Sequence, residues 1–177
     1  MRQALKLHPD SRCDAVSRIE VEVARPGGRL LLRYCVTGTL SDLVMPPVTN
    51  ARRTDELWRH TCFEAFLRAP SDEAYCEFNF SPSTQWAASR LDAYRRGRRI
   101  ADEIAASGIV VQPNEAGFEL RTSLELPNDS AWHLGLAAVI EETGGRISYW
   151  ALKHPPGRPD FHHSDCFALE LPATLPP

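Results

Sequence analysis

Apolar and polar side chains alternate with a period of two along two neighbouring segments, residues 61–67 and 75–80. Successive side chains of a β-strand point to opposite faces of the sheet, so this period predicts two strands. A short polar link, residues 70–73, joins them into a hairpin. One face of the predicted hairpin is apolar and carries Phe63, Ala65, Leu67, Cys76, Phe78 and Phe80.

The opposite face of the hairpin carries polar groups in the middle of both strands. These are the acids Glu64 and Glu77 and the amide Asn79. Burying such groups without hydrogen-bond partners costs free energy. Their position therefore indicates that the hairpin presents a polar sheet surface that could face a ligand.

Strand-like segments recur along the rest of the chain, separated by turns rich in Gly, Pro and Asn. Short strands without repeated helices between them are typical of an antiparallel β-sandwich or barrel. Residues 86–94 fit a helix or a strand equally well, and residues 100–106 predict at most a short helix. The expected strands cover residues 3–7, 18–23, 29–37, 61–67, 75–80, 109–112, 118–126, 132–140, 147–152 and 166–171.

Composition narrows the class of protein. The 177 residues suffice for one sizeable core and are few for two, so we expect a single domain over residues 1–177. A net charge of −3 gives no electrostatic reason to expect nucleic acid or an anionic membrane as partner. No apolar run is long enough to span a membrane, and the basic run at residues 95–99 is expected to be a solvated face.

The five cysteines lack CxxC spacing, and no secretory signal is visible in residues 1–20. Reduced thiols in the cytoplasm are therefore the expectation. Two long loops that contain proline, residues 40–55 and 153–165, add a further expectation, because binding sites are often built on long loops above a β scaffold.

Two arginines could join the acids of the hairpin. In the strands 29–37 and 118–126, alternation places Arg33 and Arg121 opposite the core-facing positions. We hypothesise that both converge with Glu64, Glu77 and Asn79 on one sheet face, where donors and acceptors would suit a ligand rich in hydroxyl groups. The alternative is a solvent-exposed outer sheet crossed by ion pairs.

The loop 153–165 is a second concentration of functional residue types. Its spacing matches no strong metal signature, so these side chains are expected to cap backbone groups, pin the loop to the sheet or line a pocket rim. A metal- or carboxylate-dependent hydrolase that uses Glu64, Glu77 and residues 154–165 remains an alternative. The weak candidates for metal ligands are His154, Asp160, His162 and His163.

Several of these segments together resemble a bacterial family of DOMON-like proteins, which is similar in turn to the family 9 carbohydrate-binding modules. The resemblance rests on LWRHTCFEAFL at 57–67, YCEFNFSP at 75–82, Trp86, YWAL at 149–152 and PDFHH at 159–163. It implies a jelly-roll-like β-sandwich whose concave sheet binds a sugar or haem, and it favours a strand over residues 86–94.

Under this resemblance Glu64, Glu77 and Asn79 match polar strand positions, while Trp86 and Trp150 become candidates for stacking on a ligand. Binding of haem would need a methionine or histidine at the right strand positions as an axial ligand. Both methionines lie outside the predicted strands, so sugar is favoured over haem.

The sequence thus favours a non-catalytic protein without a cofactor that binds a glycan or another polyhydroxylated small molecule. A structural or interaction domain without a small ligand is the remaining alternative. The predicted ligand-binding residues are Arg33, Glu64, Glu77, Asn79, Trp86, Arg121 and Trp150.

Overall fold

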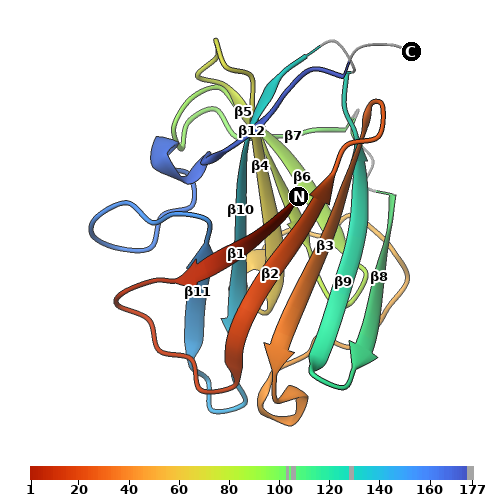
Figure 1. The fold of residues 1–177 in the computed structure, drawn as a ribbon, viewed down its shortest axis with the longest axis vertical. Coiled ribbons are helices and arrows are strands. Elements are labelled where there is room, and N and C mark those ends of the chain that lie inside the picture. Colours follow the sequence, from red (N-terminus) through yellow and green to blue (C-terminus); the bar gives the residue numbers. More distant parts are fainter. Residues whose placement is uncertain (103, 105–106, 128–129, 175–177) are drawn as a thin grey trace.

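The computed structural model describes residues 1–102, 104, 107–127 and 130–174, and β-strands dominate this part of the chain (Figure 1). The strands pair antiparallel. In sequence order they are β1 (Arg2–Leu7), β2 (Val16–Ala24), β3 (Arg29–Gly38), β4 (Cys62–Arg68), β5 (Tyr75–Phe80), β6 (Trp86–Leu91), β7 (Arg99–Ile100), β8 (Ser107–Asn114), β9 (Gly117–Glu125), β10 (Trp132–Glu141), β11 (Ile147–Ala151) and β12 (Leu169–Leu171).

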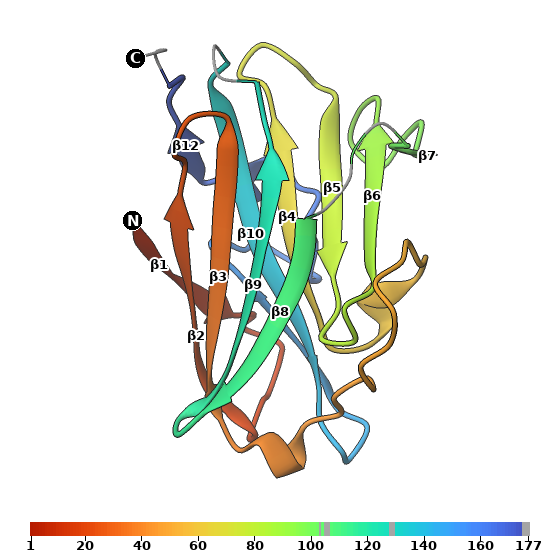
Figure 2. The same cartoon turned by 90° about the vertical axis from the view of Figure 1, so that its right-hand side faces the viewer.

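The strands form two layers that face each other (Figures 1 and 2). One layer has the order β1-β2-β3-β9-β8, and the other has the order β7-β6-β5-β4-β10-β11, with β12 paired to β10. Strand β1 joins the layers because it pairs with β2 along most of its length and with β11 at Lys6 and Leu7. The predicted antiparallel β-sandwich is therefore confirmed.

The core lies between the two layers. Phe63 of β4 is fully buried and contacts Tyr34 of β3 and Phe118 of β9, with ring centroids 5.0 and 5.9 Å apart. The six residues of the predicted apolar hairpin face are all buried in this core, so that prediction is confirmed. Because side chains alternate along a strand, this packing turns the acids of β4 and β5 away from the core.

Helical structure is limited to short 3₁₀ turns in the described residues: η1 (Leu40–Asp42), η2 (Leu57–Arg59) and η3 (Ser164–Cys166). None of the described helices could cross a membrane. The segment 86–94 contains the strand β6, as the resemblance implied. A short helix was expected over residues 100–106, but the first of these residues, Ile100, belongs to strand β7. Positions 103, 105 and 106 of the expected helix lie outside the described residues.

Candidate ligand-binding cleft

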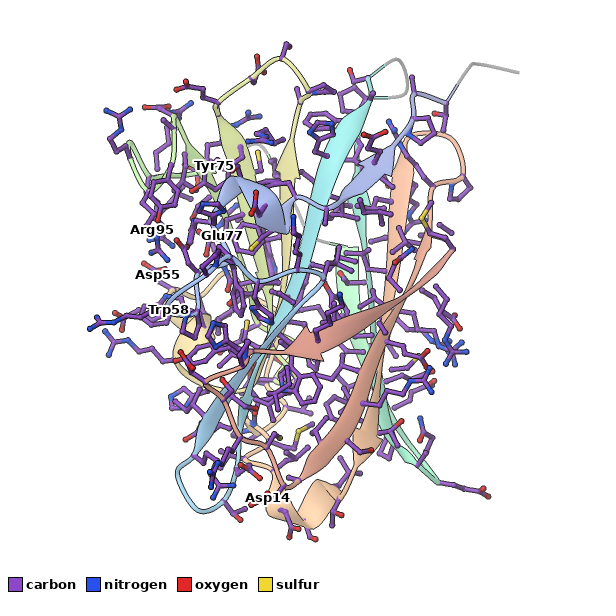
Figure 3. All side chains as sticks on the ribbon, turned by 60° about the vertical axis from the view of Figure 1, so that its left-hand side comes forward. Asp14, Asp55, Trp58, Tyr75, Glu77 and Arg95 are labelled. Atoms are coloured by element: carbon purple, nitrogen blue, oxygen red, sulfur yellow. The ribbon has the colours of Figure 1, made fainter. Side chains whose placement is uncertain are left out.

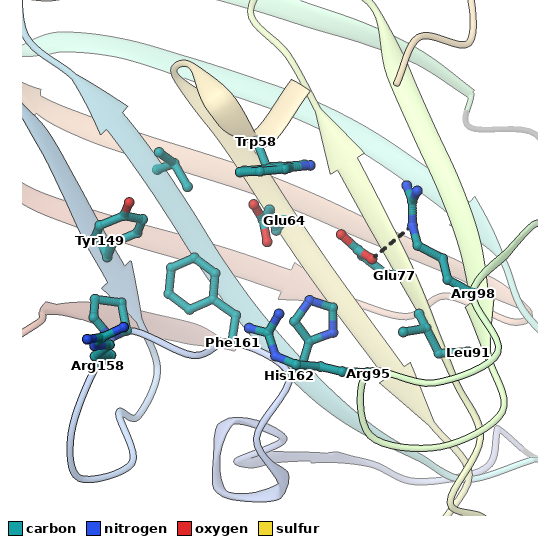
Figure 4. A pocket seen from close by; sticks show the side chains of 12 residues that line it. Trp58, Glu64, Glu77, Leu91, Arg95, Arg98, Tyr149, Arg158, Phe161 and His162 are labelled. Carbon is teal, nitrogen blue, oxygen red and sulfur yellow. Dashed lines mark ion pairs between the residues drawn. The ribbon is translucent and has the colours of Figure 1, made fainter. Parts of the chain in front are cut away.

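A cleft of about 550 Å³ lies over the face of β4 and β5 that points away from the core (Figure 4). Its floor comes from neighbouring strands of one sheet and carries Glu64, Glu77, Leu91, Val139 and Tyr149. Its walls come from η2, from the loop after β6 and from the long loop after β11. They carry Trp58, Arg95, Arg98, Arg158, Phe161 and His162. Figure 3 shows Trp58, Tyr75, Glu77 and Arg95 on this same side of the molecule.

Glu64 is the most deeply placed acid of the cleft, and only 3% of its surface is exposed. Tyr34 Oη donates a hydrogen bond to its backbone carbonyl at 2.8 Å, but no described residue hydrogen-bonds its carboxyl group. Burial raises the pKa of Glu64 well above its ordinary value, and the nearby charge of Glu77 raises it further. The environment thus favours the neutral carboxylic acid, which can both donate and accept a hydrogen bond.

Glu77, in contrast, is held by its neighbours. Asn79 Nδ2 donates to Glu77 Oε1 at 3.0 Å, and Arg98 Nε lies 4.0 Å from Oε2 (Figure 4). Asn79 is oriented in turn by the Cys62 thiol, whose Sγ lies 3.5 Å from Asn79 Oδ1. The two acids of the floor therefore differ in their partners. The side chain of Glu64 has no hydrogen-bond partner among the described residues, whereas that of Glu77 is oriented by Asn79.

A hydrogen-bond network fastens the wall loops to the sheet. Tyr75 Oη accepts from the backbone N–H of Arg95 at 3.3 Å, which leaves its proton available to His162 Nδ1 at 2.7 Å. Asp160 binds Arg95 at 2.8 Å, the backbone N–H of His162 at 3.1 Å and Tyr94 Oη at 2.5 Å. Burial lowers the pKa of His162 and so favours its neutral ring, which can accept the Tyr75 proton.

Aromatic rings stand on both sides of the acids. Trp58 projects from η2 with 45% of its surface exposed, and the Arg59 guanidinium braces it at 5.2 Å from the ring centroid. Phe161 and Tyr149 lie on the other side, with ring centroids 6.1 Å apart (Figure 4). Exposed rings beside hydrogen-bonding groups can accommodate a molecule that has apolar C–H surfaces and hydroxyl groups.

The structure brings Glu64, Glu77 and Asn79 together, but the predicted convergence with Arg33 and Arg121 is wrong. Both arginines lie on strands of the other sheet, β3 and β9. Each forms an ion pair with Glu119. A period of two shows which residues of a strand share a face, but it does not show which sheet the strand joins.

The predicted tryptophan pair does not lie in the cleft either. Trp150 is buried in the core, where its Nε1 donates to Ser148 Oγ at 3.1 Å. Trp86 packs at the edge of the same core, with the Arg53 guanidinium 4.5 Å from its ring centroid. The neighbour of Trp150, Tyr149, lines the cleft instead, because adjacent residues of a strand point to opposite faces.

Sequence reasoning also missed Trp58 and the basic loop. Trp58 lies just before the acid-bearing strand, and this position was a usable signal. Arg95 and Arg98 belong to the basic run 95–99, which was expected to be a solvated face but supplies one wall of the cleft. A positive φ of 52° at Arg95 and of 65° at Gly97 shapes this tight loop.

The four weak metal candidates have separate partners. His154 Nε2 lies 2.8 Å from the backbone oxygen of Lys6, Asp160 binds Arg95, and His162 binds Tyr75. His163 caps η3 by accepting from the backbone N–H of Asp165. Within the described ranges, no group of three or more metal-ligating side chains is placed to hold an ion.

Comparisons with known proteins identify a fold but no family. No family model matches the chain, and no curated protein matches it. A solved structure from Bacteroides uniformis ATCC 8492, described as a "putative carbohydrate-binding protein", aligns with a TM-score of 0.61 at 14% sequence identity. The alignment covers 94% of this chain and 83% of that one. At this level of identity the likeness establishes that the two proteins share a fold.

Proposed function

We propose that this protein binds a carbohydrate, or a similarly polyhydroxylated small molecule, in the cleft over β4 and β5 without transforming it. The observation that carries the proposal is the carboxyl group of Glu64, which is buried at the cleft floor without a hydrogen-bond partner among the described residues. Its oxygens face the cleft, where a molecule in the cleft can reach them. A ligand hydroxyl group would supply the missing partner.

The pairing of Glu64 with Glu77 suits hydroxyl groups in particular. A hydroxyl group both donates and accepts, so one ligand hydroxyl can accept from the neutral Glu64 acid while another donates to Glu77. The rings of Trp58 and Tyr149 would cover the apolar faces of a sugar. The fold shared with a protein described as carbohydrate-binding supports this choice of ligand class, as does the resemblance to DOMON-like proteins.

One observation favours a second candidate, a carboxylate-dependent glycoside hydrolase. Such enzymes use two neighbouring carboxyl groups, one of them protonated, and burial raises the pKa of Glu64, which shares the cleft floor with Glu77. Incubating the protein with oligosaccharides and separating the products distinguishes the candidates. We expect the saccharide to be recovered intact, whereas cleavage that is lost in Glu64→Gln would identify the hydrolase.

A thermal-shift screen against monosaccharides, oligosaccharides, haem and divalent metals tests the proposal. A ligand that binds only the native state at one hundred times its Kd stabilises the protein by about 2.7 kcal/mol. We expect a saccharide to raise the Tm of the wild type and of Arg121→Ala, which changes the opposite sheet, by similar amounts, and to raise the Tm of Glu77→Ala by a third of that amount or less. A response to metal or haem alone, or a saccharide response in Glu77→Ala as large as that of the wild type, would contradict the proposal.

A further inference from the structure

The arginines on the cleft wall differ in how their charges are balanced. Arg95 forms an ion pair with Asp160 at 2.8 Å. Arg98 forms one with Asp55 at 2.9 Å and lies 4.0 Å from Glu77. These two guanidinium groups are therefore neutralised by carboxylates of the protein and serve to position the loop and the floor.

Arg158 is the exception. It lines the cleft beside Tyr149 and is exposed to solvent (Figure 4). Within residues 1–102, 104, 107–127 and 130–174, no carboxylate lies within 4.0 Å of its guanidinium, and it makes no hydrogen bond with its side chain. An unpaired guanidinium retains its full capacity for an anion, which it can hold through two parallel N–H bonds.

The backbone around Arg158 holds it over the cleft. Pro155 and Pro156 precede it, Gly157 adopts a left-handed φ of 97°, and Pro159 follows. Proline fixes φ at positions 155, 156 and 159 and so restricts the backbone on both sides of Arg158, while the left-handed φ of Gly157 is one that glycine adopts readily. Both Arg158 and Pro159 also line an adjoining depression of about 440 Å³, which they separate from the cleft. Arg158 thus lies between the two hollows, on a segment whose backbone is restrained by proline on both sides.

The cleft consequently has two chemically different ends. The floor offers the neutral acid of Glu64 and the carboxylate of Glu77, which suit hydroxyl groups. The mouth offers the unpaired cation of Arg158, although the chain as a whole carries a net charge of −3. A neutral sugar would satisfy the floor and leave this cation without a partner.

We infer that the preferred ligand is an acidic saccharide, whose hydroxyl groups meet Glu64 and Glu77 while its anionic substituent pairs with Arg158. This inference rests on the proposed carbohydrate binding and adds the charge of the ligand. A carboxylate, a phosphate ester and a sulfate ester share the chemistry that a guanidinium recognises. The substituent would project from the floor toward the mouth of the cleft.

Calorimetric titration of neutral and acidic forms of the same sugar tests the inference. The probes are glucose, glucuronate, glucose 6-phosphate and glucose 6-sulfate, together with the corresponding galactose series. Because Arg158 is exposed, the added ion pair is partly screened by solvent, and we expect at least one acidic form to bind about fivefold more tightly than its neutral parent at low salt. The form with the highest affinity identifies the anionic group.

Arg158→Ala provides the decisive variant, since the exposed side chain can be removed without disturbing the core. We expect it to abolish the preference for the acidic sugar over its neutral parent. Arg158→Lys should keep part of the preference, because it retains the charge but not the planar fork. Arg121→Ala removes the same charge from the opposite sheet and should behave like the wild type.

Each other result has a distinct meaning. Equal affinity for neutral and acidic sugars would overturn the inference and leave carbohydrate binding intact. A preference for acidic sugars that persists in Arg158→Ala would overturn the role of Arg158. If no sugar of either series, and no longer saccharide that contains these units, binds the wild type, both the inference and the proposed function fail.

Discussion

The outer faces of the two sheets begin from the same sequence pattern and reach opposite outcomes. On β3 and β9, charged side chains alternate with core residues, and Arg33 and Arg121 pair with Glu119. On β4 and β5 the alternation is equally regular, yet Glu64 has no basic partner within ion-pair distance among the described residues, and Glu77 has Arg98 only at 4.0 Å.

Both faces carry a hollow, since Arg33 and Arg121 line one of about 810 Å³, and the faces differ in whether their buried acids are paired. Loops and η2 rise around β4 and β5, so Glu64 and Glu77 are 3% and 6% exposed at the bottom of a cleft. On the other sheet Glu119 is equally buried, at 5% exposed, but two arginines compensate its charge, and these keep 41% and 50% of their side-chain surface in solvent. Exposed ion pairs contribute little to stability, whereas a buried carboxyl group without a partner is costly. A ligand is therefore expected on the face of β4 and β5, where it would supply a hydrogen-bond partner to the carboxyl group of Glu64.

The largest expected effect on binding comes from removing the carboxylate of Glu77, and the matched control removes the carboxylate of Glu119 from the other face. Glu77→Ala and Glu119→Ala both delete a strand glutamate that lies near arginines. We expect Glu77→Ala to weaken saccharide binding by about 2 kcal/mol or more, roughly thirtyfold, because it removes an acceptor from a desolvated floor. Calorimetry on both variants makes the comparison, with Glu119→Ala binding like the wild type. Loss of binding in Glu119→Ala would mean that the two faces are not functionally separate.

A smaller loss of binding is expected at the aromatic wall. Trp58→Ala removes a ring that is 45% exposed, so we expect affinity to fall by about 1 kcal/mol, or roughly fivefold, with little change in Tm. Trp58→Phe should restore much of the affinity because it keeps an aromatic face. Titration of both variants with the same saccharide tests this, and an Ala variant with wild-type affinity would remove stacking from the proposal.

A third prediction concerns stability and its dependence on pH. The pKa of Glu64 is raised in the folded state, chiefly because of burial, so unfolding releases its proton above the ordinary pKa of a glutamate. The contribution of Glu64 to stability is therefore greatest below that ordinary pKa and declines as pH rises toward the folded value. Glu64→Gln removes this decline, so at neutral pH we expect the variant to be more stable by about 1 kcal/mol, or about 2–4 °C in Tm.

Melting curves from acid to neutral pH test this prediction. The difference in Tm between Glu64→Gln and the wild type should shrink as pH falls, and a constant difference would contradict the assignment to Glu64. The variant should also retain saccharide binding, since an amide, like the neutral acid, both donates and accepts. Glu64→Ala offers neither group and should lose affinity.

The sequence was sufficient to predict most of the strands, but it left β6 undecided, did not predict β7 and began the last strand three residues early, at Cys166. It did not predict the composition of the cleft. Alternation placed Phe63 in the core and Glu64 opposite it, and both positions follow from the geometry of a single strand. Assigning Arg33 to the cleft required the order of strands across two sheets, which depends on contacts between distant segments. Trp150 and Tyr149 show a similar limit within one strand. These neighbours point to opposite faces, so a shift of one residue in the strand's register would exchange the core residue and the cleft residue.

The smallest effect is expected where the open sheet is perturbed. Arg121 pairs with Glu119 while half exposed, and Glu119 retains a second partner in Arg33 after Arg121→Ala. Exposed ion pairs contribute about 0–1 kcal/mol, so Tm should fall by no more than about 4 °C, and by less at high salt. Saccharide affinity should be unchanged, because the guanidinium lies on the opposite sheet from Glu64. A clear loss of affinity here, with the fold intact, would place the ligand on the open face and reverse the contrast between the two sheets.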